Sequence, residues 1–102
     1  MEMKKMESLV IGMGFCYATK RIVENKEKVG YMYREIPEDF NDSGWRFFTG
    51  TESQEYVNNP DNIGIYDVNT IANYDCSIIP YLNSSFGVEF ERVLESNTFK
   101  RI

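Results

Sequence analysis

The nine residues from Asp42 to Gly50, which read DSGWRFFTG, constrain the fold more than any other stretch of the chain. They contain the only tryptophan and two consecutive phenylalanines, and glycines stand at positions 44 and 50. Aromatic residues favour a pleated, half-buried surface, and glycine suits the ends of a strand better than its middle. The stretch therefore predicts a strand that is bounded by Gly44 and Gly50.

Side chains alternate between the two faces of such a strand. Trp45 and Phe47 share one face, and Arg46 and Phe48 share the other. Because both faces carry an aromatic ring, we expect a central strand that is covered on both sides. An alternative places Arg46 and Phe48 on a recognition surface, since arginine and aromatic side chains are frequent binding anchors.

The size and charge of the chain limit the classes of protein it can belong to. Its 102 residues predict one domain, and we expect a lead-in over residues 1–12 and a single domain over 13–102. Hydrophobic residues make up 42% and charged residues 26%, as in ordinary globular proteins. A net charge of -5 argues against nucleic acid as a partner and suits a basic protein.

The rest of the chain alternates between short strands and short helices. Pro37 ends a strand that begins at Val29, and this strand is expected to form an antiparallel hairpin with the Trp45 strand across an acidic loop. The fold class is therefore predicted to be α+β, with an antiparallel or mixed sheet of four to six strands and two or three short helices. The other expected elements are strands at 15–19, 63–67 and 86–92, an edge strand or frayed end at 98–102, and helical segments at 51–58, 67–74 and 77–82.

Three of these elements carry specific local expectations. Thr51 is expected to cap the helix that runs to Asn58, as the first residue of a capping box. Residues 24–27 are expected to form a turn. In the strand from Phe86, the alternation places Phe86, Val88 and Phe90 inward and the intervening residues outward.

Catalytic and metal-binding motifs are missing from the sequence. The chain has no histidine, which excludes histidine-based triads and imidazole metal sites. Cys16 and Cys76 lie too far apart for a C-x-x-C pair, so free thiols in a reducing cytoplasm are expected. The apolar run at 9–16 is too short to span a membrane. We predict no catalytic residue, no metal and no cofactor, and a cytoplasmic location.

Several stretches of the chain occur in an order that resembles a known family. They are Lys28–Glu35 (KVGYMYRE), Asp42–Gly50 (DSGWRFFTG), Asn58–Ile63 (NNPDNI), Ile65–Asp75 (IYDVNTIANYD), Phe86-Gly87 and Phe90–Arg92. Together they resemble the bacterial domain of unknown function 2185, also described as an immunity-protein-33-like domain. The resemblance covers about residues 15–92. Cys76 and Val93 depart from it, standing where a proline and an acidic residue are usual.

The resemblance implies a non-catalytic protein-binding module that neutralises a toxin. Its signature positions form two groups, one of aromatic and aliphatic residues and one of polar residues. The first group is expected to be core and consists of Tyr31, Trp45, Phe47 and Ile65. The second group is expected to form an internal hydrogen-bonded network or a functional surface and consists of Arg34, Asp42, Arg46, Asp67 and Asn73.

Two functional hypotheses follow for the candidate binding residues Arg34, Glu38, Asp39, Asp42 and Arg46. In the first, the domain occludes a partner protein, and Glu38 and Asp39 in the loop at 37–44 face a basic surface. In the second, the chain is a small-ligand binder or an enzyme that uses a cluster of Arg34, Asp42 and Arg46.

Overall fold

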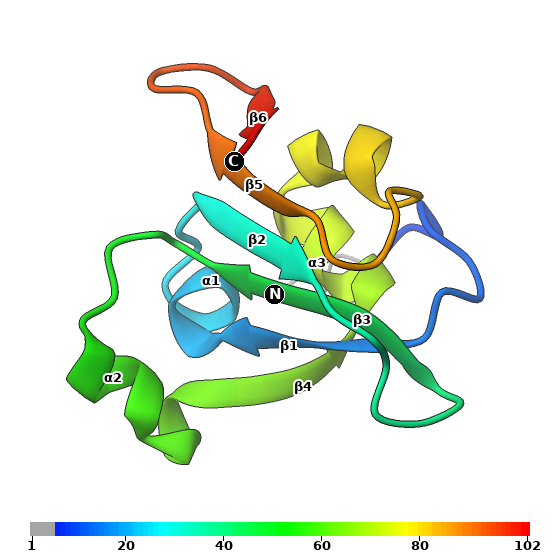
Figure 1. Ribbon diagram of the computed structural model, residues 1–102, viewed down its shortest axis with the longest axis horizontal. Coiled ribbons are helices and arrows are strands. Elements are labelled where there is room, and N and C mark those ends of the chain that lie inside the picture. Colours follow the sequence, from blue (N-terminus) through cyan, green and yellow to red (C-terminus); the bar gives the residue numbers. More distant parts are fainter. Residues whose placement is uncertain (1–5) are drawn as a thin grey trace, which may run out of the picture.

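A single six-stranded sheet organises the protein. The structure is a computed structural model that describes residues 6–102. The strand order is β4-β1-β3-β2-β5-β6 (Figure 1), and β1 and β3 run parallel whereas the other neighbours pair antiparallel. The predicted α+β class with a mixed sheet is confirmed. The strands are β1 (Phe15–Thr19), β2 (Tyr31–Arg34), β3 (Asp42–Phe48), β4 (Ile63–Asp67), β5 (Glu89–Arg92) and β6 (Phe99–Arg101).

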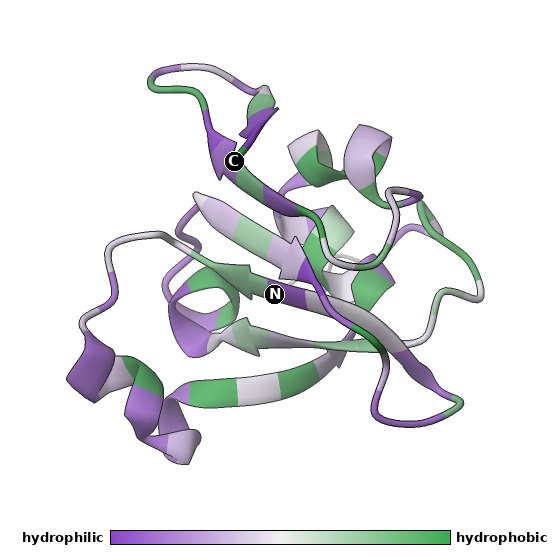
Figure 2. Cartoon of the chain, in the orientation of Figure 1, coloured by the Kyte–Doolittle hydropathy of each residue, from purple (hydrophilic) through white to green (hydrophobic). Residues whose placement is uncertain are grey.

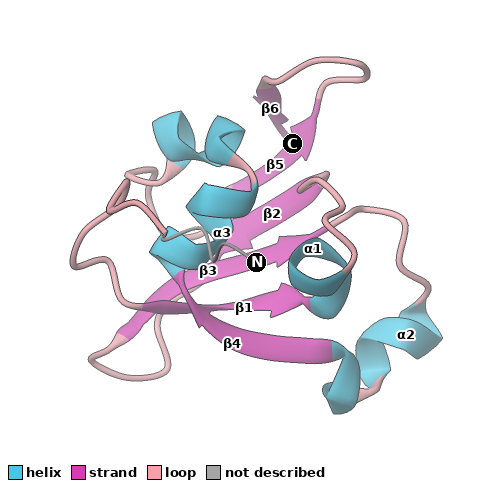
Figure 3. Ribbon diagram, turned by 180° about the vertical axis from the view of Figure 1, so that it is seen from behind, coloured by secondary structure: helices cyan, strands magenta, loops and turns pink. Residues whose placement is uncertain are grey.

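The helices are short, and most of them lie on one side of this sheet. The α-helices are α1 (Lys20–Glu24), α2 (Gln54–Asn58) and α3 (Val68–Tyr74), and the 3-10 segments are η1 (Pro60–Asn62) and η2 (Cys76–Tyr81). Figure 3 shows α1, α3 and η2 in front of one sheet face, with α2 beyond the end of β4. Within the described residues, none of these helices has the length and apolar character needed to cross a membrane.

The core lies between the sheet and α1, α3 and η2. Trp45 and Phe47 of β3 are completely buried there, and their rings stack with centroids 5.8 Å apart. The indole Nε1–H of Trp45 donates to the carbonyl oxygen of Leu82 at 3.1 Å, so its one polar group is satisfied. The predicted core role of these two aromatic residues is therefore confirmed.

The expectation that β3 is covered on both sides is wrong. No described helix packs across its second face, on which Phe48 and Tyr31 remain half-buried (Figures 1 and 3). Ile65, expected in the core, is 63% exposed, because it lies on edge strand β4 opposite Tyr17 and shares this open face. Tyr31 is likewise only partly buried.

Gly44 does not bound β3 but lies inside it. Its φ of +86° is in the left-handed region, which glycine adopts without strain. A Cβ at this position would lie 2.2 Å from the carbonyl oxygen of Glu35, so only glycine fits. The pairing of β1 with β3 also shifts its register here, which identifies an irregularity in the strand.

Two helix starts differ from the sequence expectation. Ser53, rather than Thr51, caps α2, since its hydroxyl accepts from the backbone N–H of Tyr56 at 3.1 Å. Helix α1 was not predicted and covers part of the stretch expected to turn. Its cap is the side chain of Thr19, the last residue of β1, so strand and helix follow without a linker. Asp67 caps α3, its side chain accepting from the backbone N–H of Asn69.

The predicted inward alternation from Phe86 is only partly right. Val88 and Phe90 are buried, but Phe86 is 52% exposed, because Gly87 has a φ of +94° and interrupts the extended backbone before β5 begins. Figure 2 shows the alternation of hydrophilic and hydrophobic residues that remains along β5. Of the two thiols, Cys16 is buried and Cys76 exposed, and both are free. Residues 1–5 of the expected lead-in over 1–12 lie outside the described residues.

Candidate functional site

The sheet face opposite the helices is the candidate functional site, and we call it the open face. Strand register places its side chains, because residues paired across neighbouring strands point to the same side. Tyr33 lies opposite both Arg46 and Glu89, and Tyr31 lies opposite both Phe48 and Glu91. Tyr17 extends the row across β1, since it pairs with Arg46. The open face is thus aromatic and acidic.

At one end of the open face, Arg46 is surrounded by carboxylates. Its Nη1 and Nη2 donate to the two carboxylate oxygens of Asp42 at 2.9 and 2.8 Å, and its Nε donates to Glu35 Oε2 at 2.6 Å. Glu38 lies further out, with Oε1 3.9 Å from Nη2. The Tyr17 ring covers the guanidinium at 4.4 Å. We call Arg46 with these three carboxylates the arginine cluster.

The electrostatics of the arginine cluster hold both central groups in their charged forms. Hydrogen bonds from Arg46 keep the pKa of Asp42 well below its usual range, although burial acts in the opposite direction. Burial would lower the pKa of Arg46, but its hydrogen bonds to Asp42 and Glu35 outweigh that effect and raise it. All three guanidinium nitrogens donate within the protein. The cluster is therefore held together by hydrogen bonds within the protein.

The structure does not bring all the predicted site residues together. Arg34 points away from the cluster, to the Trp45 side of the sheet, where its Nε and Nη1 donate to the carbonyl oxygens of Ser43 and Ser84 at 2.9 and 2.8 Å. Asp39 lies exposed in the β2–β3 loop and accepts from the backbone N–H of Asn41 at 2.8 Å. Glu38 reaches the cluster only at its rim.

The predicted polar network is likewise divided into local parts. Asp42 and Arg46 form the arginine cluster, whereas Asp67 caps α3. Asn73 binds the lead-in instead, accepting from the backbone N–H of Glu7 at 3.0 Å and donating to its carbonyl oxygen at 2.8 Å. These side chains therefore make three separate local interactions: an ion pair in the sheet, a helix cap, and hydrogen bonds to the backbone of the lead-in.

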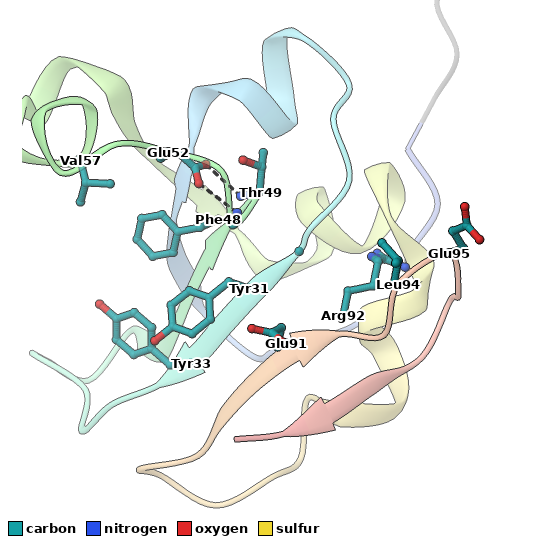
Figure 4. A pocket seen from close by; sticks show the side chains of 12 residues that line it. Tyr31, Tyr33, Phe48, Thr49, Glu52, Val57, Glu91, Arg92, Leu94 and Glu95 are labelled. Carbon is teal, nitrogen blue, oxygen red and sulfur yellow. Dashed lines mark hydrogen bonds between the residues drawn. The ribbon is translucent and has the colours of Figure 1, made fainter.

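At the other end of the open face, three aromatic rings line a groove (Figure 4). The rings of Tyr31, Tyr33 and Phe48 have centroids 5.8 to 6.1 Å apart, which makes one continuous apolar patch. Burial raises the pKa of Tyr31 above its usual range, and a hydrogen bond from its hydroxyl to Glu89 at 2.6 Å adds to the shift. Burial also raises the pKa of Tyr33. Both phenols are therefore neutral at physiological pH.

Glycines and two flanking segments shape this aromatic groove, whose volume is about 610 Å³. Gly30 and Gly50 line it just before β2 and just after β3. Val57 of α2 lines one side, and Leu94 in the β5–β6 loop lines the other. Gly30 is also sterically required, because a Cβ there would lie 2.0 Å from the carbonyl oxygen of Thr49.

The charges that line the groove differ in how far they are neutralised. Glu52 accepts from the backbone N–H groups of Thr49 and Gly50 at 2.8 and 3.0 Å, and these bonds lower its pKa against the effect of burial (Figure 4). Arg92 lines the groove, but its guanidinium is bound to Asp75 in a buried ion pair. Two other carboxylates lie open to solvent.

These two carboxylates are Glu91 and Glu95. Glu91 meets only the exposed Lys100, with Oε1 3.5 Å from its Nζ. Glu95 has no ion pair within residues 6–102. Since Glu89 lies two residues from Glu91 along β5 and accepts from the Tyr31 hydroxyl, the groove carries an excess of negative charge.

The sequence analysis included Phe48 in a candidate recognition surface but did not identify the aromatic groove to which Phe48 belongs. It offered Arg46 and Phe48 as a recognition surface, but the structure separates them into the arginine cluster and the groove. The alternation of Tyr31 and Tyr33 around the buried Met32 was a signal for a second exposed aromatic row. The contributions of Val57 and Leu94 depend on tertiary packing and had no such signal.

The chain is a member of the immunity protein Imm33 domain family, whose profile matches residues 16–102. This match confirms the family resemblance found in the sequence. No curated protein and no solved structure matches the chain.

Proposed function

We propose that this protein is a non-catalytic immunity protein that neutralises a toxin by binding it through the open face. The observation that carries the proposal is the uncovered aromatic groove with its excess of carboxylates, on a sheet whose other face is packed beneath helices. Exposed aromatic and apolar side chains framed by polar groups are typical of protein-binding surfaces. Membership of an immunity-protein family supports a toxin as the partner.

Both ends of the open face carry further apolar side chains that a partner can bury. Phe40, at the tip of the β2–β3 loop, is 98% exposed, and Leu94 in the β5–β6 loop is 89% exposed. Glu38 and Asp39 precede Phe40 in the sequence. We therefore keep the β2–β3 loop as part of the proposed binding surface. We place the encounter in the cytoplasm, where the free thiols stay reduced.

Titration of toxin activity separates occlusion from catalysis. Candidate toxins encoded by genes that neighbour the gene for this protein are purified, and the activity of each is measured while the protein is added in increasing amounts. Occlusion predicts that inhibition is complete at one equivalent and that the toxin recovered after denaturation has an unchanged mass. Full inhibition at a small fraction of an equivalent would instead show an enzymatic mechanism. A lack of inhibition at any ratio would overturn the proposed function.

A further inference from the structure

We propose that the aromatic groove is the seat of a cationic side chain, an arginine or a lysine, that the toxin carries on an exposed segment. This inference rests on the proposed function and names the chemistry of the partner. Three observations support it: the aromatic patch, the negative charge of the groove, and the contacts that arginine and lysine side chains of this chain make with other aromatic rings.

The aromatic patch offers ring faces on which a cation can rest. Aromatic faces carry partial negative charge and attract guanidinium and ammonium groups within about 6 Å of the centroid. The rings of Tyr31, Tyr33 and Phe48 are mutually close, so their faces act on the same region of the groove.

The protein repeatedly covers aromatic rings with its own cations. Arg46 lies over Tyr17, Arg34 over Phe86 and Arg92 over Phe99, at 4.4 to 4.7 Å from the centroids. Arg21 and Lys26 make the same contact with Tyr56 and Tyr74. Within residues 6–102, no cation lies over any of the three groove rings. Among the described residues, the groove is thus a solvent-open aromatic cluster over which this chain places no cation of its own.

The charge of the groove fits a cation that comes from outside. Glu91 and Glu95 line it, and Glu89 stands beside Tyr31, whereas Arg92 is already neutralised by Asp75. The apolar side chains of Leu94 and Val57 flank the aromatic floor, which suits the methylene stem of a lysine or arginine. The volume of about 610 Å³ is large enough for such a side chain with part of its backbone.

A peptide titration tests the groove without knowledge of the toxin. The probe is an eight-residue peptide of glycine and serine with two arginines, and the control peptide has neutral citrulline at both positions. Backbone amide chemical shifts of the labelled full chain are followed by NMR at low salt. We expect saturable changes at Tyr31, Thr49 and Gly50 with the arginine peptide, and at least tenfold weaker binding with citrulline.

Two variants of equal charge show whether the groove or the net charge is responsible. Glu91→Gln with Glu95→Gln removes two carboxylates from the groove, and Glu24→Gln with Glu27→Gln removes two exposed ones on and after α1. The groove variant is expected to weaken arginine-peptide binding at least fivefold, and the α1 variant less than twofold. Equal weakening, or shifts spread over the whole acidic surface, would overturn the inference. Tetramethylammonium that binds the groove as well as the peptide does would point to a small quaternary amine instead.

The toxin itself then distinguishes this inference from the proposed function. Glu91→Lys with Glu95→Lys is expected to reduce toxin affinity at least tenfold. If the wild-type chain neutralises the toxin and the lysine variant binds within twofold of it, the inference fails and the proposed function stands. A wild-type chain that neutralises no toxin overturns the proposed function, and with it the assignment of the cation to a toxin.

Discussion

The two faces of strand β3 differ in how their aromatic residues are used. Trp45 and Phe47 are stacked, fully buried and covered by helices, whereas Phe48 on the opposite face joins Tyr31 and Tyr33 in a groove that is open to solvent. Burial of large apolar side chains is the main source of stability. The comparison indicates that one face holds the fold together and that the other is free for recognition.

The open face is itself divided between structure and binding. Arg46 is enclosed by Asp42 and Glu35, and its charge is matched within the protein. The carboxylates of Glu91 and Glu95 have no comparable internal partner among the described residues. Charged groups that are satisfied internally stabilise the fold, whereas exposed and weakly paired ones are available to a partner.

The largest expected effect comes from the covered face. Trp45→Ala is expected to lower the free energy of unfolding by roughly 3–5 kcal/mol, because a large buried ring leaves a cavity. Urea denaturation followed by circular dichroism measures this loss. The native tryptophan fluorescence should be blue-shifted and move to longer wavelength on unfolding. A solvent-like emission from the native protein would contradict the core role of Trp45.

The next largest effect is expected at the arginine cluster. Asp42→Asn removes the buried anion that binds Arg46 through both carboxylate oxygens, and the free energy of unfolding is expected to fall by roughly 3 kcal/mol, since Glu35 remains as a partner. The matched control is Glu38→Gln, which changes an exposed carboxylate 3.9 Å from Arg46 and should cost less than about 1 kcal/mol. Equal losses in both variants would show that the cluster does not depend on its buried pair.

The same pair predicts an acid dependence of stability. The folded pKa of Asp42 lies below its unfolded value, so this carboxylate stabilises the fold fully above about pH 4. The contribution is lost as the pH falls towards the folded pKa. Unfolding measurements between pH 5 and pH 2 should therefore show a steeper loss for the wild type than for Asp42→Asn. Parallel curves would contradict the shifted pKa.

A smaller effect on stability, with a large effect on binding, is expected in the groove. Tyr33→Ala should cost about 1 kcal/mol of stability, because the ring is half-buried, yet it should weaken toxin binding at least tenfold. Thermal denaturation and calorimetric titration with the toxin measure the two quantities. A variant that loses stability but binds normally would assign the ring to the fold alone.

The smallest effect on stability is expected in the β2–β3 loop. Glu38→Lys with Asp39→Lys changes two exposed side chains and should alter the free energy of unfolding by less than about 0.5 kcal/mol. Slower association with the toxin at low salt would support a steering role for these carboxylates. An association rate that does not change would restrict recognition to the groove end of the open face.

Local patterns in the sequence predicted much of the fold. Alternation and Pro37 located the hairpin and β4, because these signals act between near neighbours. The left-handed residues Gly44 and Gly87 were the main sources of error, since each changes the backbone where a regular strand was expected. Packing between distant segments determines which face of the sheet the helices cover. Alternation along one strand does not predict which face that is.

The candidate site was less predictable for the same reason. Sequence reasoning grouped Arg34 with Arg46 because both stand beside aromatic residues, but Arg34 pairs with Trp45 and so lies on the opposite side of the sheet. The groove joins residues from β2, β3, α2 and the β5–β6 loop. Only the strand order brings these segments together, and strand order could not be read from the sequence.

Hydrogen–deuterium exchange tests most directly whether the open face binds the toxin. Exchange is measured on the protein alone and in complex with the toxin it neutralises. We predict that complex formation protects the backbone amides at 30–34, 48–50 and 91–95, which surround the aromatic groove. Protection confined to α1, α3 and η2, with unchanged exchange around the groove, would contradict the account.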